Sequence, residues 1–208
     1  SLMKNYKKNF EILKKNHVYS EDMEHDACGV GLIASTEGKK SRKVVEYGIE
    51  ALKAVWHRGA VDADGKTGDG AGIHVEIPKD FFIEKIEVTG HAHDNSEICV
   101  GMIFLPRNDY AAQESCKTIV ESELTKNDFS IYGWRQVPVN PKVLGEKAFQ
   151  TMPEIIQVLF KSNDPELLNK DLERKIYETR RIIENKAFQI SLNNFYICSL
   201  SSKSIIYK

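Results

Sequence analysis

The sequence predicts an α+β fold, and three observations support this prediction. Hydrophobic residues make up 41% of the 208 residues, which is enough to build a sizeable core. Some segments carry apolar residues at alternating positions, and other segments carry them at helical spacing. The two kinds of segment follow one another along the chain from about residue 30 onward. The length fits one domain, or one domain with an arm.

Strands are predicted where apolar residues run together or alternate with polar residues. The segment 98–105 is almost entirely apolar, so we expect it to be a buried central strand. Residues 194–200 and 203–208 are typical of the two arms of a hairpin that turns at Ser201 and Ser202. The other expected strands are 30–34, 73–77, 129–137 and 155–160.

Three helices are predicted from capping residues and apolar stripes. Ser41 can cap a helix that runs to about Trp56, and Asn108 can cap the next one. The clearest helix starts at Asp164, a good N-cap, with Pro165 at the first helical position. The apolar faces expected for the three helices are, in order, Val45, Ile49, Leu52 and Trp56; Ala112, Cys116, Ile119 and Leu124; and Leu168, Leu172, Ile176 and Ile183.

Charge and cysteine usage exclude several classes of protein. The formal net charge is −1, so no overall field attracts the chain to nucleic acid or to an anionic membrane. No apolar run approaches the roughly 20 residues that span a bilayer. The four cysteines form no C-x-x-C pair, which favours free thiols in a reducing compartment. We expect a cytoplasmic protein, with an organelle as the alternative, that binds neither nucleic acid nor membrane.

Residues 1–27 form an arm that differs from the rest of the chain. Ser1 and Leu2 precede Met3, which indicates a tag remnant before a native start. The arm is basic, and both a short amphipathic helix and a targeting peptide are open interpretations of it. At the other end, the chain stops on a predicted strand whose backbone groups would be unpaired. We therefore expect an incomplete domain, with a final edge strand as the alternative.

Cys28 is the first candidate for chemistry. It lies in the segment HDACGVG at residues 25–31, where a polar arm meets an apolar strand. The neighbouring glycines leave room beside the thiol, which suits a nucleophile that must admit a substrate carbonyl. A small buried strand residue is the other interpretation, because free cysteines are often buried and inert.

Two glycine-containing segments are the second candidate. Residues 56–60 read WHRGA and residues 67–72 read TGDGAG, and glycines at this density let backbone amides approach a ligand. A phosphate loop is disfavoured because Gly-Lys-Ser/Thr is absent and the turn leads into a strand. A tight turn with positive φ is the simpler interpretation. His91 and His93 have metal-ligand types but lie in a predicted loop, so we expect no metal site there.

Five segments in order and in register closely resemble the start of the large subunit in the glutamate synthase family. They are DACGVG at 26–31, HRGA at 57–60, TGDGAGI at 67–73, GWRQVP at 133–138 and MPEIIQ at 152–157. The resemblance implies a class II glutamine amidotransferase domain with the four-layer α/β/β/α fold of N-terminal-nucleophile hydrolases. Residues 28–208 would then be the first part of that domain, and residues 1–27 would contain a propeptide that is removed.

The resemblance also implies roles for individual residues. Cys28 would be the nucleophile, and its own freed α-amino group would be the general base. Arg58 and Gly59 would line the substrate site, although an ion pair that holds the turn is an equal interpretation of Arg58. Asp69 and Gly70 match the family's glycine-rich turn, and we expect them to contact substrate.

The family resemblance further implies partners beyond these residues. Glutamine would be hydrolysed, and the ammonia would pass to a synthase domain in the remainder of the chain that acts on 2-oxoglutarate. FMN and an iron–sulfur cluster are implied for that parent enzyme, together with a small electron-donor subunit, and no cofactor is implied for this fragment. The electron donor itself is left open between NADPH, NADH and ferredoxin.

The sequence also departs from the family pattern. The family grips glutamine with an Arg-Phe-Ser-Thr segment and stabilises the oxyanion with a His-Asn-Gly segment, and neither string occurs in the 208 residues. We therefore expect the chain to be inactive alone. The alternatives are the same fold serving another ammonia acceptor, as in asparagine or phosphoribosylamine synthesis, a noncatalytic scaffold, or a metal-binding module using His91 and His93.

Overall fold

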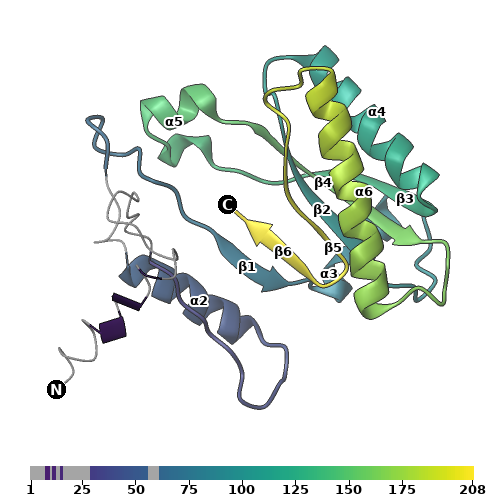
Figure 1. Ribbon diagram of the computed structural model, residues 1–208, viewed down its shortest axis with the longest axis horizontal. Coiled ribbons are helices and arrows are strands. Elements are labelled where there is room, and N and C mark those ends of the chain that lie inside the picture. The colour runs from purple at the N-terminus through teal and green to yellow at the C-terminus, as the bar shows by residue number, and fades with distance from the viewer. Residues whose placement is uncertain (1–7, 10, 13–14, 16–28, 56–60) are drawn as a thin grey trace.

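The computed structural model of the chain describes residues 8, 9, 11, 12, 15, 29–55 and 61–208. Two antiparallel sheets lie between helices, which confirms the predicted α+β class with its order of helical layer, sheet, sheet and helical layer. Helices α4 (Tyr110–Lys126) and α6 (Asn169–Gln189) form one outer layer, and α2 (Arg42–Ala54) lies beside the smaller sheet on the opposite side (Figure 1).

The larger sheet has the strand order β3-β4-β2-β5. Its members are β3 (Phe129–Gln136), β4 (Glu154–Ser162), β2 (Cys99–Leu105) and β5 (Tyr196–Ser201), all antiparallel to their neighbours. The predicted central strand is confirmed, because β2 pairs with β4 on one side and β5 on the other and all of its residues except Phe104 are buried. Both of its faces are covered, which is why its sequence is an unbroken apolar run.

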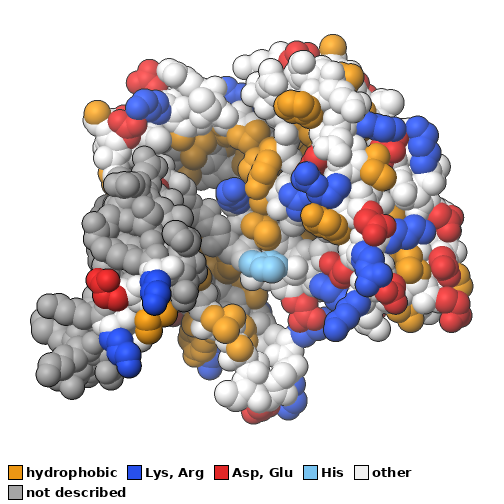
Figure 2. All heavy atoms as spheres, in the orientation of Figure 1, with side chains coloured by type: hydrophobic (Ala, Val, Ile, Leu, Met, Phe, Trp, Pro, Cys, Tyr) orange, Lys and Arg blue, Asp and Glu red, His pale blue; other side chains and the backbone are white. Residues whose placement is uncertain are grey.

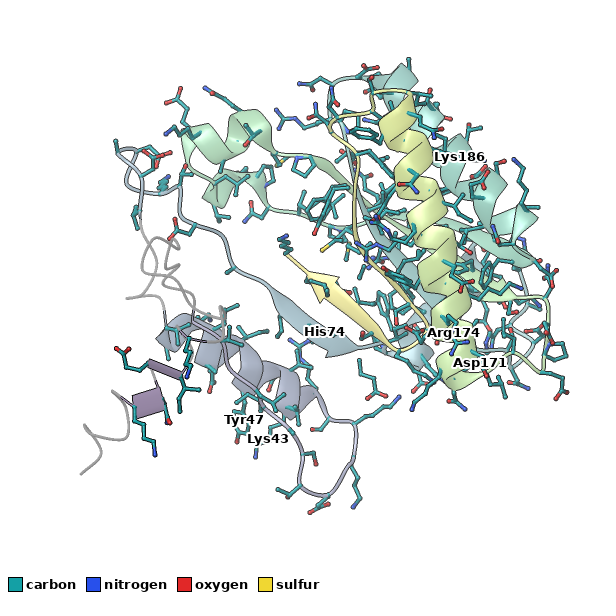
Figure 3. All side chains as sticks on the ribbon, in the orientation of Figure 1. Lys43, Tyr47, His74, Asp171, Arg174 and Lys186 are labelled. Atoms are coloured by element: carbon teal, nitrogen blue, oxygen red, sulfur yellow. The ribbon has the colours of Figure 1, made fainter. Side chains whose placement is uncertain are left out.

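The smaller sheet corrects the predicted C-terminal hairpin. After β5 the chain turns at Ser201 and Ser202, but β6 (Ser204–Tyr207) pairs with β1 (Ile73–Glu76) instead of with β5. Across this small sheet, His74 Nε2 lies within hydrogen-bond distance of the Ser204 hydroxyl, at 2.6 Å. Figure 3 labels His74. The turn therefore carries the chain from the larger sheet to the smaller sheet. The prediction that 203–208 pairs with 194–200 is wrong.

The Glu173 side chain holds this crossing turn from helix α6. Its carboxylate accepts hydrogen bonds from the Ser202 backbone N–H at 2.6 Å and from the Ser202 hydroxyl at 2.7 Å. The Ser201 hydroxyl donates to the second carboxylate oxygen at 2.9 Å. The outer helical layer thus fixes the point at which the chain changes sheets.

Two hydrophobic cores lie on the two faces of the larger sheet. One core joins that sheet to α4 and α6, with Cys116, Val120 and Ile176 fully buried. The other joins it to the smaller sheet and to α3 (Lys79–Val88), an unpredicted helix that contributes Phe82 and Ile86. Between β3 and β4 the chain forms a 3-10 turn (Pro141–Val143) and the short helix α5 (Glu146–Thr151). Within the described ranges, no helix is both long and apolar enough to cross a bilayer.

The predicted starts of two helices need correction. Asp109, one residue after the predicted cap, accepts the Ala112 N–H at 2.9 Å and caps α4. Helix α6 starts at Asn169, five residues after the predicted cap, and the Asp164 side chain instead caps a turn by accepting the Glu166 N–H at 2.9 Å. Ser41 does cap α2 as predicted, accepting from the Lys43 N–H at 3.2 Å.

The strand predicted at 30–34 is absent from the structure. These residues adopt no regular element, and Val30 and Leu32 are 94% and 90% exposed. A strand needs a neighbour to satisfy its backbone groups, and none of the described strands pairs with this segment. An apolar pattern alone was therefore not enough to make this segment a strand.

Candidate active site

Only part of the predicted site can be placed. Cys28, Arg58 and Gly59 lie outside the described residues, and so does nearly all of the arm 1–27. Asp69 and Gly70 are described, and both line a pocket of about 450 Å³. These two residues are the part of the predicted site that the structure describes.

The pocket lies where the turn at 69–72 meets the ends of two strands that belong to different sheets. The turn forms part of the lining, and the other lining residues are Tyr196, Cys198, Ile206 and Lys208. Figure 2 shows hydrophobic side chains in a hollow of this face of the molecule. A pocket of this size between two sheets can admit a small polar molecule such as an amino acid.

Two glycines shape the turn for specific reasons. Gly70 has a φ of +92°, which disfavours any residue with a side chain. At Gly72, an added Cβ would lie 3.0 Å from the Tyr207 carbonyl oxygen, so the backbone passes close against the end of β6. The expectation of a tight turn with positive φ is confirmed, and the turn also forms a wall of the pocket.

A compact loop at residues 61–68 precedes the turn. Its ends meet at a bridge between Val61 and Gly68, and the Asp62 N–H donates to the Thr67 carbonyl at 2.7 Å. Inside the loop, the Asp64 carboxylate accepts the Thr67 hydroxyl at 2.5 Å and the Thr67 N–H at 2.7 Å. The Thr67 hydroxyl and then its N–H hold the pKa of Asp64 well below the ordinary range, so this carboxylate is charged near neutral pH.

The pocket's own thiol is unsuited to nucleophilic attack. Cys198 lies in a buried position, and its Sγ donates to the Ile206 carbonyl at 3.5 Å. Burial raises the pKa of this thiol above its ordinary value, although Lys208 and Arg180 partly oppose that effect. Cys198 therefore stays protonated and acts as a wall of the pocket.

The two other motifs of the resemblance meet on neighbouring strands. Arg135 of β3 donates to the Gln157 side-chain oxygen of β4 at 2.8 Å, and its guanidinium lies over the Phe81 ring at 5.1 Å. Gln157 is fully buried, and its amide nitrogen has no hydrogen-bond partner among the described residues. These motif residues therefore join the two strands to α3, outside the residues that line the pocket.

The two histidines considered for metal binding have local hydrogen-bond partners. His91 Nδ1 lies 3.0 Å from the Thr89 hydroxyl, and His93 Nε2 lies 3.0 Å from the Ser96 carbonyl. In the ranges that the structure describes, no three His, Cys, Asp or Glu side chains are grouped as metal ligands would be.

The sequence was compared with models of known protein families. The profile of the glutamine amidotransferases class-II matches residues 28–208. The chain belongs to this family. The first matched residue of the class-II amidotransferase profile is Cys28, the predicted nucleophile.

Curated relatives of this amidotransferase chain carry glutamate synthase names. The glutamate synthase [NADPH] large chain of Azospirillum brasilense is 52% identical over 203 residues, which are 98% of this chain and 13% of that protein. The ferredoxin-dependent glutamate synthase 2, chloroplastic, of Arabidopsis thaliana is 38% identical over 203 residues, 96% of this chain and 12% of its own length. A ferredoxin-dependent glutamate synthase 2 of Synechocystis is 37% identical over 186 residues, 89% of this chain and 12% of its own. The chain thus spans about an eighth of the length of these relatives.

Proposed function

We propose that this domain hydrolyses the side-chain amide of glutamine, with Cys28 as the nucleophile. The observation that carries the proposal is the family match, which starts at Cys28 and runs to residue 208. The pocket supports the proposal, because the turn that contains Asp69 and Gly70 forms a wall of a site large enough for an amino acid. Arg58 and Gly59 are proposed to line the same site.

The proposed reaction proceeds in two steps. The α-amino group of Cys28, with a reference pKa of about 7.7–8.0, takes the thiol proton as sulfur attacks the amide carbon. The C–N bond breaks, the protonated base supplies the proton to the leaving nitrogen, and ammonia departs from a glutamyl thioester. Water then attacks the thioester carbon, and glutamate and the free thiol are released.

This mechanism requires a free amine on Cys28. We propose that residues 1–27 are removed and that residues 28–208 are the amidotransferase part of the chain. Intact mass and N-terminal sequencing of the purified chain test this directly. A chain that begins at Cys28 supports the proposal, and a stable chain that begins at Ser1 would show that the base remains locked in a peptide bond.

The ammonia is proposed to serve glutamate synthesis, as the names of the relatives suggest. In that scheme it reacts with 2-oxoglutarate in a synthase portion that holds FMN and an iron–sulfur cluster and takes electrons from a donor subunit or protein. Among the described residues, Cys99, Cys116 and Cys198 are each buried and form no common ligand group for such a cluster. We propose that the remainder of the parent enzyme holds both cofactors. We also propose that the protein is cytoplasmic.

A chimaera provides the functional test. The aligned 203 residues of the Azospirillum brasilense large chain are replaced by those of this chain, and glutamine-dependent and ammonia-dependent glutamate synthesis are both measured. We expect Cys28→Ala to abolish the glutamine-dependent rate and to leave the ammonia-dependent rate intact. Equal glutamine-dependent rates with and without the substitution would refute the proposal and favour a noncatalytic scaffold.

The 208-residue chain alone provides a second measurement. Removal of a single oxyanion donor typically costs about 10²–10³ in turnover, and this sequence contains neither of the family's substrate and oxyanion segments. We expect its glutamine turnover to equal that of its Cys28→Ala variant. Turnover above that control would show that the 208 residues are sufficient for catalysis and would refute the expectation of an inactive chain.

A further inference from the structure

Helix α5 begins directly against the loop that precedes the glycine-rich turn. Gly145 is the N-cap of α5 and has an ordinary φ of −70°, so backbone conformation does not require glycine there. The lack of space requires glycine instead. An added Cβ would collide with the Thr67 hydroxyl and the Asp64 carboxylate and would lie 2.6 Å from the Thr67 nitrogen. The two segments are therefore in backbone contact.

Polar contacts fasten the same junction. The Lys147 ammonium lies 2.6 Å from the Asp62 carboxylate, across 85 residues of sequence. The Ala148 N–H reaches the Thr67 hydroxyl at 3.5 Å. Thr67 thus contacts both sides of the junction, because its hydroxyl also donates to Asp64 within the loop.

The position of this junction gives it a consequence for the pocket. Thr67 is two residues before Asp69, the first residue of the pocket wall. At the other end of the turn, Gly72 is held against β6 by its close approach to the Tyr207 carbonyl. The wall is therefore a short segment fixed at both ends, so a displacement at Thr67 is transmitted to Asp69 and Gly70.

We propose that α5 and the loop 61–68 form a latch that positions the glycine-rich turn for amide hydrolysis, with Gly145 and Lys147 as its positioning residues. This inference rests on the proposed glutamine hydrolysis. It assigns a catalytic consequence to α5, which carries none of the five sequence motifs. The proposed latch acts through the position of the turn.

The geometry gives the size of the effect. An alanine at 145 must move its Cβ from 2.6 Å to at least 3.4 Å from the Thr67 nitrogen to reach ordinary contact. Displacements near 1 Å in positioning elements can cost about 10²-fold in rate. We expect Gly145→Ala to lower kcat for glutamine about 10- to 100-fold, with a smaller change in KM.

The experiment uses the chimaera with four variants. Gly145→Ala is compared with Gly48→Ala, whose new Cβ meets only the Ile73 side chain at an ordinary 3.4 Å. Lys147→Met removes the ion pair at an exposed site, where misfolding is not expected, and Lys147→Arg restores the charge. The expected order of glutamine-dependent kcat is wild type and Gly48→Ala first, then Lys147→Arg, Lys147→Met and Gly145→Ala. The ammonia-dependent rate should be the same in all of them.

The outcomes separate the two proposals. An inactive wild-type chimaera refutes the proposed function and the latch with it. An active wild type with unchanged kcat in both Gly145→Ala and Lys147→Met overturns the latch alone. A parallel fall in the ammonia-dependent rate would assign the junction to general stability and would also overturn the positioning role.

Discussion

The substitution Glu123→Gln should destabilise the domain in a pH-dependent manner. Glu123 lies on α4 with only 6% of its side chain exposed, and it accepts the Lys186 ammonium of α6 at 2.5 Å and the Lys126 ammonium at 3.2 Å. Figure 3 labels Lys186 on α6. Breaking a fully buried ion pair costs about 3–5 kcal/mol, and an exposed pair is worth about 0–1 kcal/mol. Because Lys186 and Lys126 are 42% and 63% exposed, we expect about 1–2 kcal/mol at pH 7.

The sign of the pH dependence follows from the pKa of this carboxyl. The hydrogen bond from Lys186, followed by that from Lys126, lowers the pKa of Glu123 below its ordinary 4.5. A group with a lowered pKa in the folded state stabilises the protein above its unfolded pKa, and the contribution is lost as pH falls through the folded value. The difference between wild type and Glu123→Gln should therefore be constant from pH 7 to about 5 and should shrink below about 4.5.

Urea denaturation of the 208-residue chain at a series of pH values measures this difference. Glu114→Gln is the matched control, because Glu114 pairs with Lys117 on the same helix but is 73% exposed. We expect the control to change the free energy of unfolding by less than about 0.5 kcal/mol at every pH. A Glu123→Gln variant that is as stable as wild type at pH 7, or whose deficit does not change with pH, would refute the reasoning.

Three further predictions concern packing, the crossing turn and the thiols. Gly101→Ala should cost about 1–3 kcal/mol in urea denaturation, because its Cβ would lie 2.6 Å from Val158 and 2.7 Å from Leu200, whereas Gly48→Ala should be tolerated. Glu173→Gln should cost about 1–3 kcal/mol, since its carboxylate accepts three hydrogen bonds at the crossing turn; unchanged stability would contradict this. The three buried cysteines should resist a thiol reagent at pH 8 until the chain is denatured, because burial raises their pKa values, while Cys28 should react in the native protein. Mass spectrometry of the labelled chain checks this, and rapid native labelling of a buried cysteine would contradict it.

The positions of three strands of the larger sheet could be predicted because their signals are local. The apolar run at 98–105 has a single physical reading, a strand covered on both faces, and β2 shows it. The predicted strands 129–137 and 155–160 likewise correspond to β3 and β4 within two residues. Such segments carry the evidence for their structure within themselves.

Which strand pairs with which could not be predicted in the same way. Two strand-like segments with a serine turn between them look like a hairpin, yet β6 pairs with a strand from early in the chain. The predicted start of α6 failed for a conformational reason. Asn169, its first residue, has a φ of +51°, so a helix that began at Asp164 could not continue through it.

In the candidate site too, local features could be predicted from the sequence and contacts between distant segments could not. Glycine density and the family resemblance selected Asp69 and Gly70, and the structure places both at a pocket; their contact with substrate stays a prediction. The junction between Gly145 and Thr67 was missed, because neither segment carries a signal of a contact that spans about 80 residues. A glycine with an ordinary φ at a helix start becomes informative only when its neighbour in space is known.

The pairing of β1 with β6 has a consequence for the order of folding. His74 and Ser204 are 130 residues apart in sequence, so the smaller sheet closes a very long loop. Contacts of this kind carry a high entropic cost and form late, after the local strands and helices between them. During synthesis, β1 cannot pair until β6 has been made, and β6 lies near the end of the described residues. The wall of the pocket at Gly72 rests on β6, so the site is expected to be among the last parts of the domain to take shape.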